Sequence, residues 1–229
     1  MIMIIIRRVI YLLAAGLFIY TGCTPQQFVV QHAEKGHFSR AYKHLGVYCD
    51  RADVHIHGWN NDSISIAVTM DSTIKNNYSF LVDSSGDSLL LIGKHGVVSA
   101  AGNSPLPEAD IALPYNTGVF VRTEGSIIVD TMRGAIDASA TDTILYRCPM
   151  FTSPVNLTSS GGSVTVELPG DVSCDVDLEC SENAEIRLDS KNFHGEKLKN
   201  RVKGTLGAGG ALLKITGEKG VIALFDGNE

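Results

Sequence analysis

The chain has 229 residues, a formal net charge of -6 at pH 7, 23 glycines and only 7% aromatic residues. A length in this range suits one domain or two small ones. The acidic excess excludes a nucleic-acid-binding surface, which needs clustered Lys and Arg side chains, so we expect no nucleic-acid partner. The many glycines and the aliphatic composition favour β structure over a helical bundle.

The N-terminus has the pattern of an export signal. Arg7 and Arg8 precede an apolar run of 12 residues, 9–20, which is followed by Thr21-Gly22-Cys23. The order basic, apolar and small is typical of a secretory signal peptide, and the run is shorter than the ~20 residues with which a helix crosses a bilayer. We therefore expect residues 1–22 to be a signal peptide. A secreted protein cut elsewhere, or an uncleaved signal anchor, is the alternative.

The segment Tyr20-Thr21-Gly22-Cys23 resembles the lipobox of bacterial lipoproteins. The resemblance implies cleavage before Cys23 and attachment of diacylglycerol and a fatty acyl chain, such as palmitate, to that residue. Several acyl chains, at ~0.8 kcal/mol per buried CH₂, anchor a protein firmly. Thr24 rather than Asp follows the cysteine, which implies the outer membrane in bacteria that use an Asp retention rule. We therefore expect a lipid-anchored protein of the cell envelope.

Three segments follow the signal. Residues 23–42 are polar and predict a tether, residues 43–225 predict one β domain, and residues 226–229 form a short C-terminal tail. Within the domain, short runs of alternating apolar and polar residues bounded by Gly, Asn, Asp or Ser indicate strands. Residues 53–68 and 78–92 each have the form of a strand, a turn and a second strand.

A coarser repeat extends from Asp110 towards the C-terminus. An apolar residue at the start of a strand recurs with spacings of 17, 20, 22 and 36 residues, at Ile127, Ile144, Val164, Ile186 and Ile222. Spacings near 20 are typical of a β-solenoid, in which each coil covers the apolar edge of its neighbour. The widest spacing contains residues 189–210, a charged and then Gly-rich segment that is either a loop or a degenerate coil.

Small residues occupy the corners between these strands. Gly161 and Gly162 stand before one strand, and Gly125 and Gly220 stand before two others. Because glycine adopts positive φ without steric cost, we expect the chain to turn there with φ > 0. Asn183, which also tolerates positive φ, takes the same place before another strand.

Residues 109–129, 155–180 and 202–224 resemble the putative-adhesin family of exported bacterial proteins, related to the auto-transporter adhesin head GIN-type domain. That family repeats a strand, a Thr-x-x-Gly-like corner and an Ile or Val strand; Leu113-Pro114 and Gly207-Ala208-Gly209-Gly210 match further motifs. The resemblance implies a right-handed parallel β-helix-like solenoid, with an N-terminal part that is more hairpin-like. An antiparallel β-sandwich is the alternative fold. The resemblance also implies a surface or adhesion role, and no catalytic residues can be carried over from it.

Four further cysteines remain, Cys49, Cys148, Cys174 and Cys180. An even number in an exported chain permits two disulfides, while small buried free thiols are the alternative. Cys174 and Cys180 would lie ~20 Å apart on one strand, so they can pair only if the chain bends back. No close pair has zinc-ligand spacing, and we expect no cysteine metal site.

His55 and His57 are two residues apart in a predicted strand and therefore share one face. Such a pair can bind a metal with the help of His95 or a carboxylate. Because no third ligand is identifiable in the sequence, we expect an exposed polar face with Val54 and Ile56 pointing inward. We accordingly predict no metal site and no cofactor.

Trp59, the only tryptophan, precedes a predicted turn. An aromatic ring there can stack on a sugar or serve an interface; partial burial as a lid on the core is the alternative. Together with His55 and His57 it is our candidate for contact with a partner, a glycan or a protein of the cell envelope.

Asp175, Asp177 and Glu179 share one face of another predicted strand. Enzymes that cleave polysaccharides use paired carboxylates, but these need a defined separation in a cleft. Alternation with Val176 and Leu178 favours a solvated outer face instead. We therefore expect no catalytic residues and no enzyme.

These patterns predict a non-enzymatic lipoprotein of the cell envelope that acts as an adhesin or as a surface scaffold that binds a partner. A structural or signalling lipoprotein that faces the periplasm is the alternative. A β-helix enzyme acting on carbohydrates is the third hypothesis.

Overall fold

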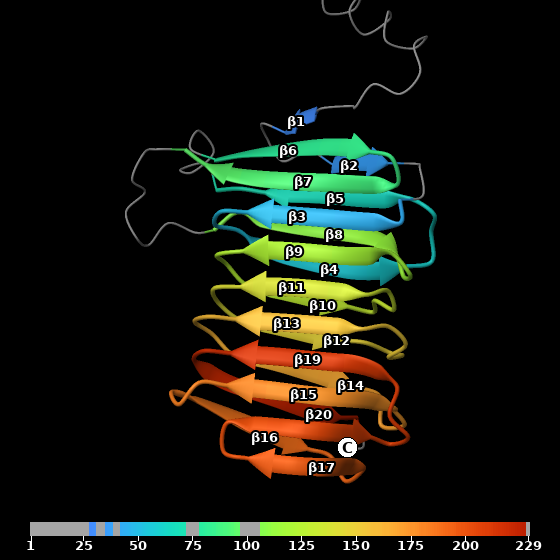
Figure 1. Cartoon of the computed structure of the whole chain (residues 1–229). Coiled ribbons are helices and arrows are strands. Elements are labelled where there is room, and N and C mark those ends of the chain that lie inside the picture. The colour runs from blue at the N-terminus through green and yellow to red at the C-terminus, as the bar shows by residue number, and fades with distance from the viewer. Residues whose placement is uncertain (1–27, 31–34, 39–41, 72–77, 97–105, 228–229) are drawn as a thin grey trace, which may run out of the picture.

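Figure 1 shows the computed structural model, which describes residues 28–30, 35–38, 42–71, 78–96 and 106–227. Every regular element in these ranges is a strand, so the predicted all-β class is confirmed. No helix in them is long and apolar enough to cross a membrane. Cys23 and the predicted signal peptide lie outside the described residues, and their roles stay predictions.

The strands form two sheets. Sheet A has the spatial order β1 (Phe28–Val30), β6 (Tyr78–Ser85), β7 (Ser88–His95), β3 (His44–Cys49), β9 (Gly118–Thr123), β11 (Ile136–Ala140), β13 (Val155–Ser159), β19 (Ala211–Gly217), β15 (Cys174–Cys180), β18 (Arg201–Leu206) and β17 (Phe193–Leu198). Sheet B has the order β16 (Ala184–Asp189), β20 (Gly220–Asp226), β14 (Val164–Leu168), β12 (Ile144–Arg147), β10 (Ile127–Asp130), β4 (Asp53–Trp59), β8 (Glu108–Pro114), β5 (Ile64–Thr69) and β2 (Lys35–Phe38).

The chain passes back and forth between the sheets in the middle of the molecule. From β9 to β14, odd-numbered strands lie in sheet A and even-numbered strands in sheet B, and neighbours within each sheet run parallel. Towards the ends the pairing becomes antiparallel, as between β6 and β7 and between β17 and β18. The fold is therefore two mixed sheets packed face to face, with the parallel ladders expected of coils and the open sheets expected of a sandwich (Figure 1).

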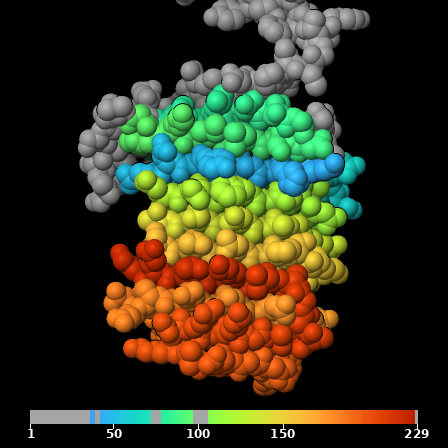
Figure 2. Space-filling view, in the orientation of Figure 1, coloured from blue at the N-terminus to red at the C-terminus, as the bar shows by residue number. Residues whose placement is uncertain are grey.

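The repeat seen in the sequence is a register row of sheet B. Ile127 is paired with Ile144, Ile144 with Val164, Val164 with Ile222 and Ile222 with Ile186. The spatial order departs from the chain order, because β19 lies between β13 and β15 in sheet A and β20 lies between β14 and β16 in sheet B. In Figure 2 the red band of β19 accordingly separates yellow and orange bands.

The same kind of insertion occurs near the N-terminus. The strands β3 and β4 precede β7 and β8 in the chain, which lie on one side of them, and β9 and β10, which lie on the other side. Residues 78–92 contain the predicted hairpin, since β6 and β7 are paired. Residues 53–68 contain the predicted strand, turn and second strand, β4 and β5. These two strands are not paired with each other, because β8 lies between them, parallel to β4 and antiparallel to β5.

Two segments outside the clear alternating pattern contain strands. Residues 23–42, predicted to be a tether, contribute β1 and β2, which pair with β6 and β5. The charged segment 189–210 forms the β17–β18 hairpin, which extends sheet A beyond β15. Its backbone groups pair with the edge of the sheet, and this hydrogen bonding does not depend on an apolar pattern in the side chains.

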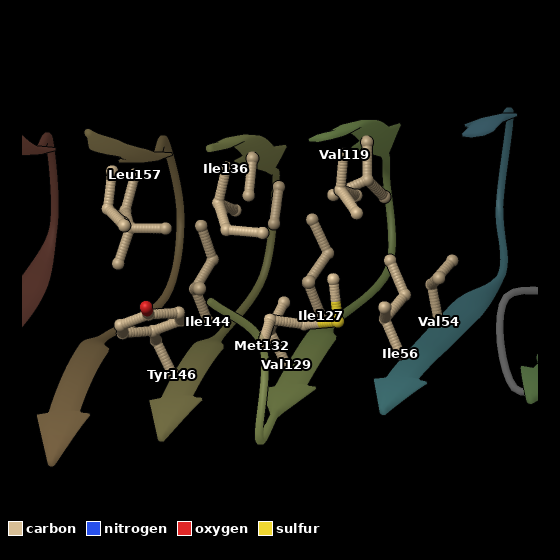
Figure 3. Close-up of a cluster of buried hydrophobic side chains, with 14 of the residues drawn as sticks. Val54, Ile56, Val119, Ile127, Val129, Met132, Ile136, Ile144, Tyr146 and Leu157 are labelled. Atoms are coloured by element: carbon tan, nitrogen blue, oxygen red, sulfur yellow. The ribbon is translucent and has the colours of Figure 1, made fainter. Parts of the chain in front are cut away.

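The core lies between the sheets (Figure 3). Val119 and Ile136 from sheet A meet Ile127 and Ile144 from sheet B, and all four are at least 96% buried. Full burial of such a side chain contributes about 1.5–3 kcal/mol. Val54 and Ile56 point inward as predicted, because alternate residues of a strand face opposite sides.

The corner glycines have a different role from the predicted one. Gly220 has φ +74°, as expected, but Gly125, Gly161, Gly162 and Asn183 are not among the described residues with positive φ. Gly125 and Gly161 are needed for close approach of backbones: an added Cβ would overlap the carbonyl oxygen of Ala52 or of Thr141. Glycine lets successive corners stack directly on one another.

The four described cysteines are free thiols, and all of them are buried. Cys49 and Cys180 belong to a row of small residues that crosses sheet A at the last residues of its strands. The row also contains Thr123, Ala140, Ser159 and Gly217. A small side chain is what this row has in common. Of the two alternatives left open by the sequence, the small buried hydrophobe is the one observed.

Candidate functional site

A groove runs over the outer face of sheet A. Its volume is about 640 Å³, it is open to solvent, and its lining comes from β6, β7, β3, β9, β11, β13 and β19 together with nearby turns. One register row crosses it: Asp83, Leu90, Gly46, Phe120, Asp137, Asn156 and Lys214. Neighbouring strands are ~4.8 Å apart, so a row of seven residues is about 29 Å long. The groove therefore suits an extended ligand that lies across the strands.

Two glycines lower the surface inside the groove. Gly46 and Gly118 face outward on the neighbouring strands β3 and β9, where other residues would place side chains. A Cβ on Gly46 would lie 2.9 Å from Leu90 Cδ1. The absence of two side chains leaves the floor of the groove close to the backbone.

Aromatic rings form one wall. Tyr48 and Phe120 have ring centroids 5.2 Å apart and planes tilted by 33°. The Arg122 guanidinium carbon lies 5.6 Å from the centroid of the Phe120 ring, at cation–π distance. Tyr48 is 42% exposed, a high value for a large apolar residue. Such rings offer flat apolar faces to a ligand.

Polar groups continue the groove beyond Phe120. Asp137, Asn156 and Lys214 follow one another across three parallel strands. Asn156 Nδ2 donates to Asp137 Oδ1 at 3.0 Å, which orients both side chains. The groove thus combines an apolar wall with a carboxylate, an amide and an ammonium group, which can bind hydroxyl or amide groups of a ligand.

The residues predicted to contact a ligand lie on the other sheet. His55, His57 and Trp59 are half-buried on the outer face of β4. Trp59 Nε1 donates to the Ser63 backbone oxygen at 2.8 Å, and its ring meets His57 edge-on at 6.5 Å between centroids. The tryptophan therefore packs on the sheet surface, apart from the groove on sheet A, whose residues the sequence analysis did not single out.

Two carboxylates missed by the sequence analysis flank the histidines. Asp110 on β8 is the cross-strand neighbour of His55, and its Oδ1 lies 3.8 Å from His55 Nδ1 and 3.3 Å from His57 Nδ1. Asp130 on β10 lies on the other side, with its Oδ2 3.0 Å from His55 Nε2. Arg147 Nη1 lies 3.6 Å from Asp130 Oδ1.

A strained corner holds β4 against β10. Thr131, directly after Asp130, has φ +59°, a sparsely populated value for a β-branched residue. Its hydroxyl donates to the Gly58 backbone oxygen at 2.8 Å and accepts from the Gly58 N–H at 3.0 Å. A Cβ on Gly58 would lie 2.7 Å from the Thr131 backbone oxygen. This contact fixes the ends of the two strands that carry His57 and Asp130.

The acidic face of β15 lies opposite basic residues. Asp177 has Lys214 on one side and Lys203 on the other as cross-strand neighbours, and Arg201 Nη2 lies 3.4 Å from Asp177 Oδ1. Asp175 and Glu179 are exposed. The row therefore alternates in charge, which stabilises cross-strand pairs.

Comparison with known proteins shows likeness at the level of the fold. No family model matches the sequence, and no curated protein matches it significantly. The crystal structure of a "putative cell adhesion protein" from Clostridium sporogenes matches with a TM-score of 0.58 at 11% identity, over 88% of this chain and 99% of that one. A "putative adhesin" from Bacteroides fragilis matches with a TM-score of 0.45 at 9% identity, over 89% and 100%.

Proposed function

We propose that this chain is a non-enzymatic lipoprotein of the bacterial cell envelope that binds a partner in the manner of an adhesin. The groove on the outer face of sheet A is the observation that carries the proposal. Lipid on Cys23 anchors the protein in the outer membrane, and the outer face of sheet A exposes the groove to the surroundings. The likeness of the fold to a protein described as a cell adhesion protein supports this role.

In this proposal the central strands wind as a right-handed parallel solenoid, the fold that the resemblance to the putative-adhesin family implies. The support is the parallel pairing of β9, β11 and β13, each pair connected through a strand of sheet B. Connections between parallel strands of one sheet are right-handed in ~98% of cases. Stacked coils give a long lateral face on which a polymeric ligand can lie.

The partner in this proposal is a glycan chain. A sugar ring has an apolar face that packs on an aromatic ring and hydroxyl groups that bond to carboxylate, amide or ammonium groups. Phe120 and Tyr48 supply the rings, while Asp137, Asn156 and Lys214 supply the polar groups. The length of the row suits several sugar units.

The distribution of carboxylates supports a binding role without catalysis. Asp175, Asp177 and Glu179 lie on an open sheet face among cations, whereas glycoside hydrolysis needs two carboxyl groups on either side of the substrate at a defined separation. Asp137 in the groove is engaged by Asn156.

Binding of the full chain to a glycan array tests the ligand class. We expect retention of one group of glycans and a loss of about tenfold in affinity, or ~1.4 kcal/mol, for Phe120→Ala, because the ring wall is removed. Lys219→Ala, an exposed change at a turn, is the control. Binding to peptides and to no glycan would contradict the glycan assignment.

Protease treatment of intact cells tests the location. An adhesin is cleaved on intact cells, whereas a structural or signalling lipoprotein that faces the periplasm is cleaved only after the outer membrane is opened. Full protection on intact cells would contradict the adhesin role.

A further inference from the structure

We propose that His55, His57 and Asp110 form a site for a divalent transition-metal ion of the Zn²⁺ type on the outer face of sheet B. The inference goes beyond the proposed glycan-binding role, because the groove lies on the other sheet. One atom from each of the three residues lies within 4.8 Å of the other two. Two imidazoles and a carboxylate are a common ligand set for this class of ion.

The register of three strands assembles the site. His55 and His57 are on the same face of β4, and β8 places Asp110 directly beside His55. The residue of β8 beside His57 is Ala112, and Ala67 on β5 is the neighbour of Asp110 on its other side. These small neighbours leave room for the Asp110 side chain to reach both rings.

The distances from Asp110 to the two imidazole rings are close to those of tetrahedral coordination. Metal–ligand bonds of ~2.0–2.1 Å to imidazole nitrogen and carboxylate oxygen give about 3.3 Å between two ligand atoms of a tetrahedron. Asp110 Oδ1 lies 3.3 Å from His57 Nδ1 and 3.8 Å from His55 Nδ1. A half-ångström adjustment of the exposed Asp110 side chain brings the longer distance to this value. Water or a group from another molecule would supply the fourth ligand.

Asp130 selects the tautomer of His55 that can bind a metal. A carboxylate only accepts hydrogen bonds, so the 3.0 Å contact between Asp130 Oδ2 and His55 Nε2 places a proton on Nε2. In the neutral ring Nδ1 then carries the lone pair, and this is the atom that faces Asp110. A carboxylate that holds the outer nitrogen of a metal-binding histidine is the usual second partner in zinc sites.

Charge and rigidity favour the same assignment. Arg147 pairs with Asp130 Oδ1, which leaves Oδ2 to His55. Asp110 provides a carboxylate towards the cation position, and its neighbour on β5 is the uncharged Ala67. The hydroxyl contacts of Thr131 with Gly58 hold β4, which carries both histidines, against β10, which carries Asp130.

Titration of the full chain in detergent with ZnCl₂ tests the proposal. We expect one Zn²⁺ per chain in calorimetry, and at least tenfold weaker binding for His57→Gln and Asp110→Asn, because each variant removes one ligand. The positioning residue Asp130 is tested by Asp130→Asn, with an expected loss of about 10–100-fold. His194→Gln, an exposed histidine on β17, is the matched control and should leave the affinity unchanged.

Two further measurements separate ligation from unspecific attraction. X-ray absorption of the Zn²⁺-loaded chain should show two imidazoles and oxygen ligands at about 2.0–2.1 Å, and circular dichroism should show that the variants retain their strands. Mg²⁺ and Ca²⁺, which prefer all-oxygen sites, should not compete at equal concentration. Absence of Zn²⁺ binding, unchanged affinity in both ligand variants, or equal competition by Ca²⁺ would each overturn the proposal.

Discussion

Thr123 bridges two corners of the structure through the backbone of Ala52. Its hydroxyl donates to the Ala52 carbonyl oxygen at 2.6 Å and accepts from the Ala52 N–H at 3.3 Å, although the two residues are 71 positions apart. The Gly125 N–H also donates to the Thr123 hydroxyl oxygen, at 3.1 Å. A buried hydroxyl therefore satisfies three backbone groups where β3 and β9 end, and it accounts for the pairing of Thr with a nearby Gly at the corner.

Thr123→Val keeps the shape of this side chain and removes the hydroxyl. We expect the free energy of unfolding to fall by about 1–3 kcal/mol, because buried backbone groups of Ala52 and Gly125 lose their partner. Urea unfolding followed by circular dichroism measures the change. Thr158→Val, on the half-exposed outer face of β13, should change the free energy by less than ~0.5 kcal/mol. Equal effects of the two variants would contradict the role of the corner hydroxyl.

Gly125→Ala tests the close approach of neighbouring corners. The added methyl would overlap the Ala52 carbonyl oxygen, and we expect destabilisation of at least 1–3 kcal/mol, the usual cost of overpacking. Gly86→Ala in the β6–β7 turn is the comparison. That glycine has φ +57° and open space around it, so only the left-handed strain of about 1–2 kcal/mol applies. A stable Gly125→Ala protein with an unchanged thermal midpoint would show that the corners can separate at no cost.

The buried thiols predict a loss of stability at alkaline pH. Burial raises the pKa of Cys49 and of Cys174 from an ordinary value of 9.0 to about 12. The unfolded chain ionises these thiols above pH 9 while the folded chain keeps them neutral, so the stabilisation present below pH 9 is lost as the pH rises towards 12. The slope is about 1.4 kcal/mol per pH unit for each thiol.

Unfolding in urea at several values between pH 8 and pH 11 measures this slope. Cys49→Ala and Cys174→Ala should each reduce it, whatever their effect at pH 8. A double variant with the slope of the original chain would contradict the assignment. In the folded chain both thiols should also resist alkylation at pH 8, because the thiolate is the reactive form.

The N-terminal anchor is tested by labelling with a fatty acid. Cells that express the full chain should incorporate labelled palmitate, and Cys23→Ala should abolish both the label and membrane retention, since a chain without acyl groups loses ~0.8 kcal/mol per CH₂ of membrane affinity. Cys49→Ala, which changes a buried thiol, is the control. Label that persists in Cys23→Ala would place the modification elsewhere.

Local patterns in the sequence were sufficient for several of the strands and for their inward residues. Alternation identified β3, β4, β5, β6 and β7 together with the inward positions Val54 and Ile56, because side-chain direction in a strand depends only on residue parity. The recurring Ile and Val positions form one register row, so the repeat also had a structural cause.

Long-range order could not be predicted in the same way. Any Val- or Ile-rich strand can stack on any other, so nothing local shows that Ile222 lies between Val164 and Ile186. Asp110 joins His55 for the same reason: 55 positions separate them, and only the pairing of β8 with β4 brings them together. The groove was missed because Gly46 and Phe120 become neighbours only through the register of β3 with β9.

The proposal that the groove on sheet A binds a glycan is tested by filling the groove with a side chain and measuring the affinity for the glycan. Gly46→Val places a side chain on the groove floor, and the contact it meets is the flexible end of Leu90, so the strand itself should not shift. We predict at least a tenfold loss of affinity for the glycan retained on the array, with an unchanged thermal midpoint. Thr165→Val, on the outer face of sheet B, should bind like the original chain. Equal binding by the original chain and by Gly46→Val would contradict the groove as the binding site.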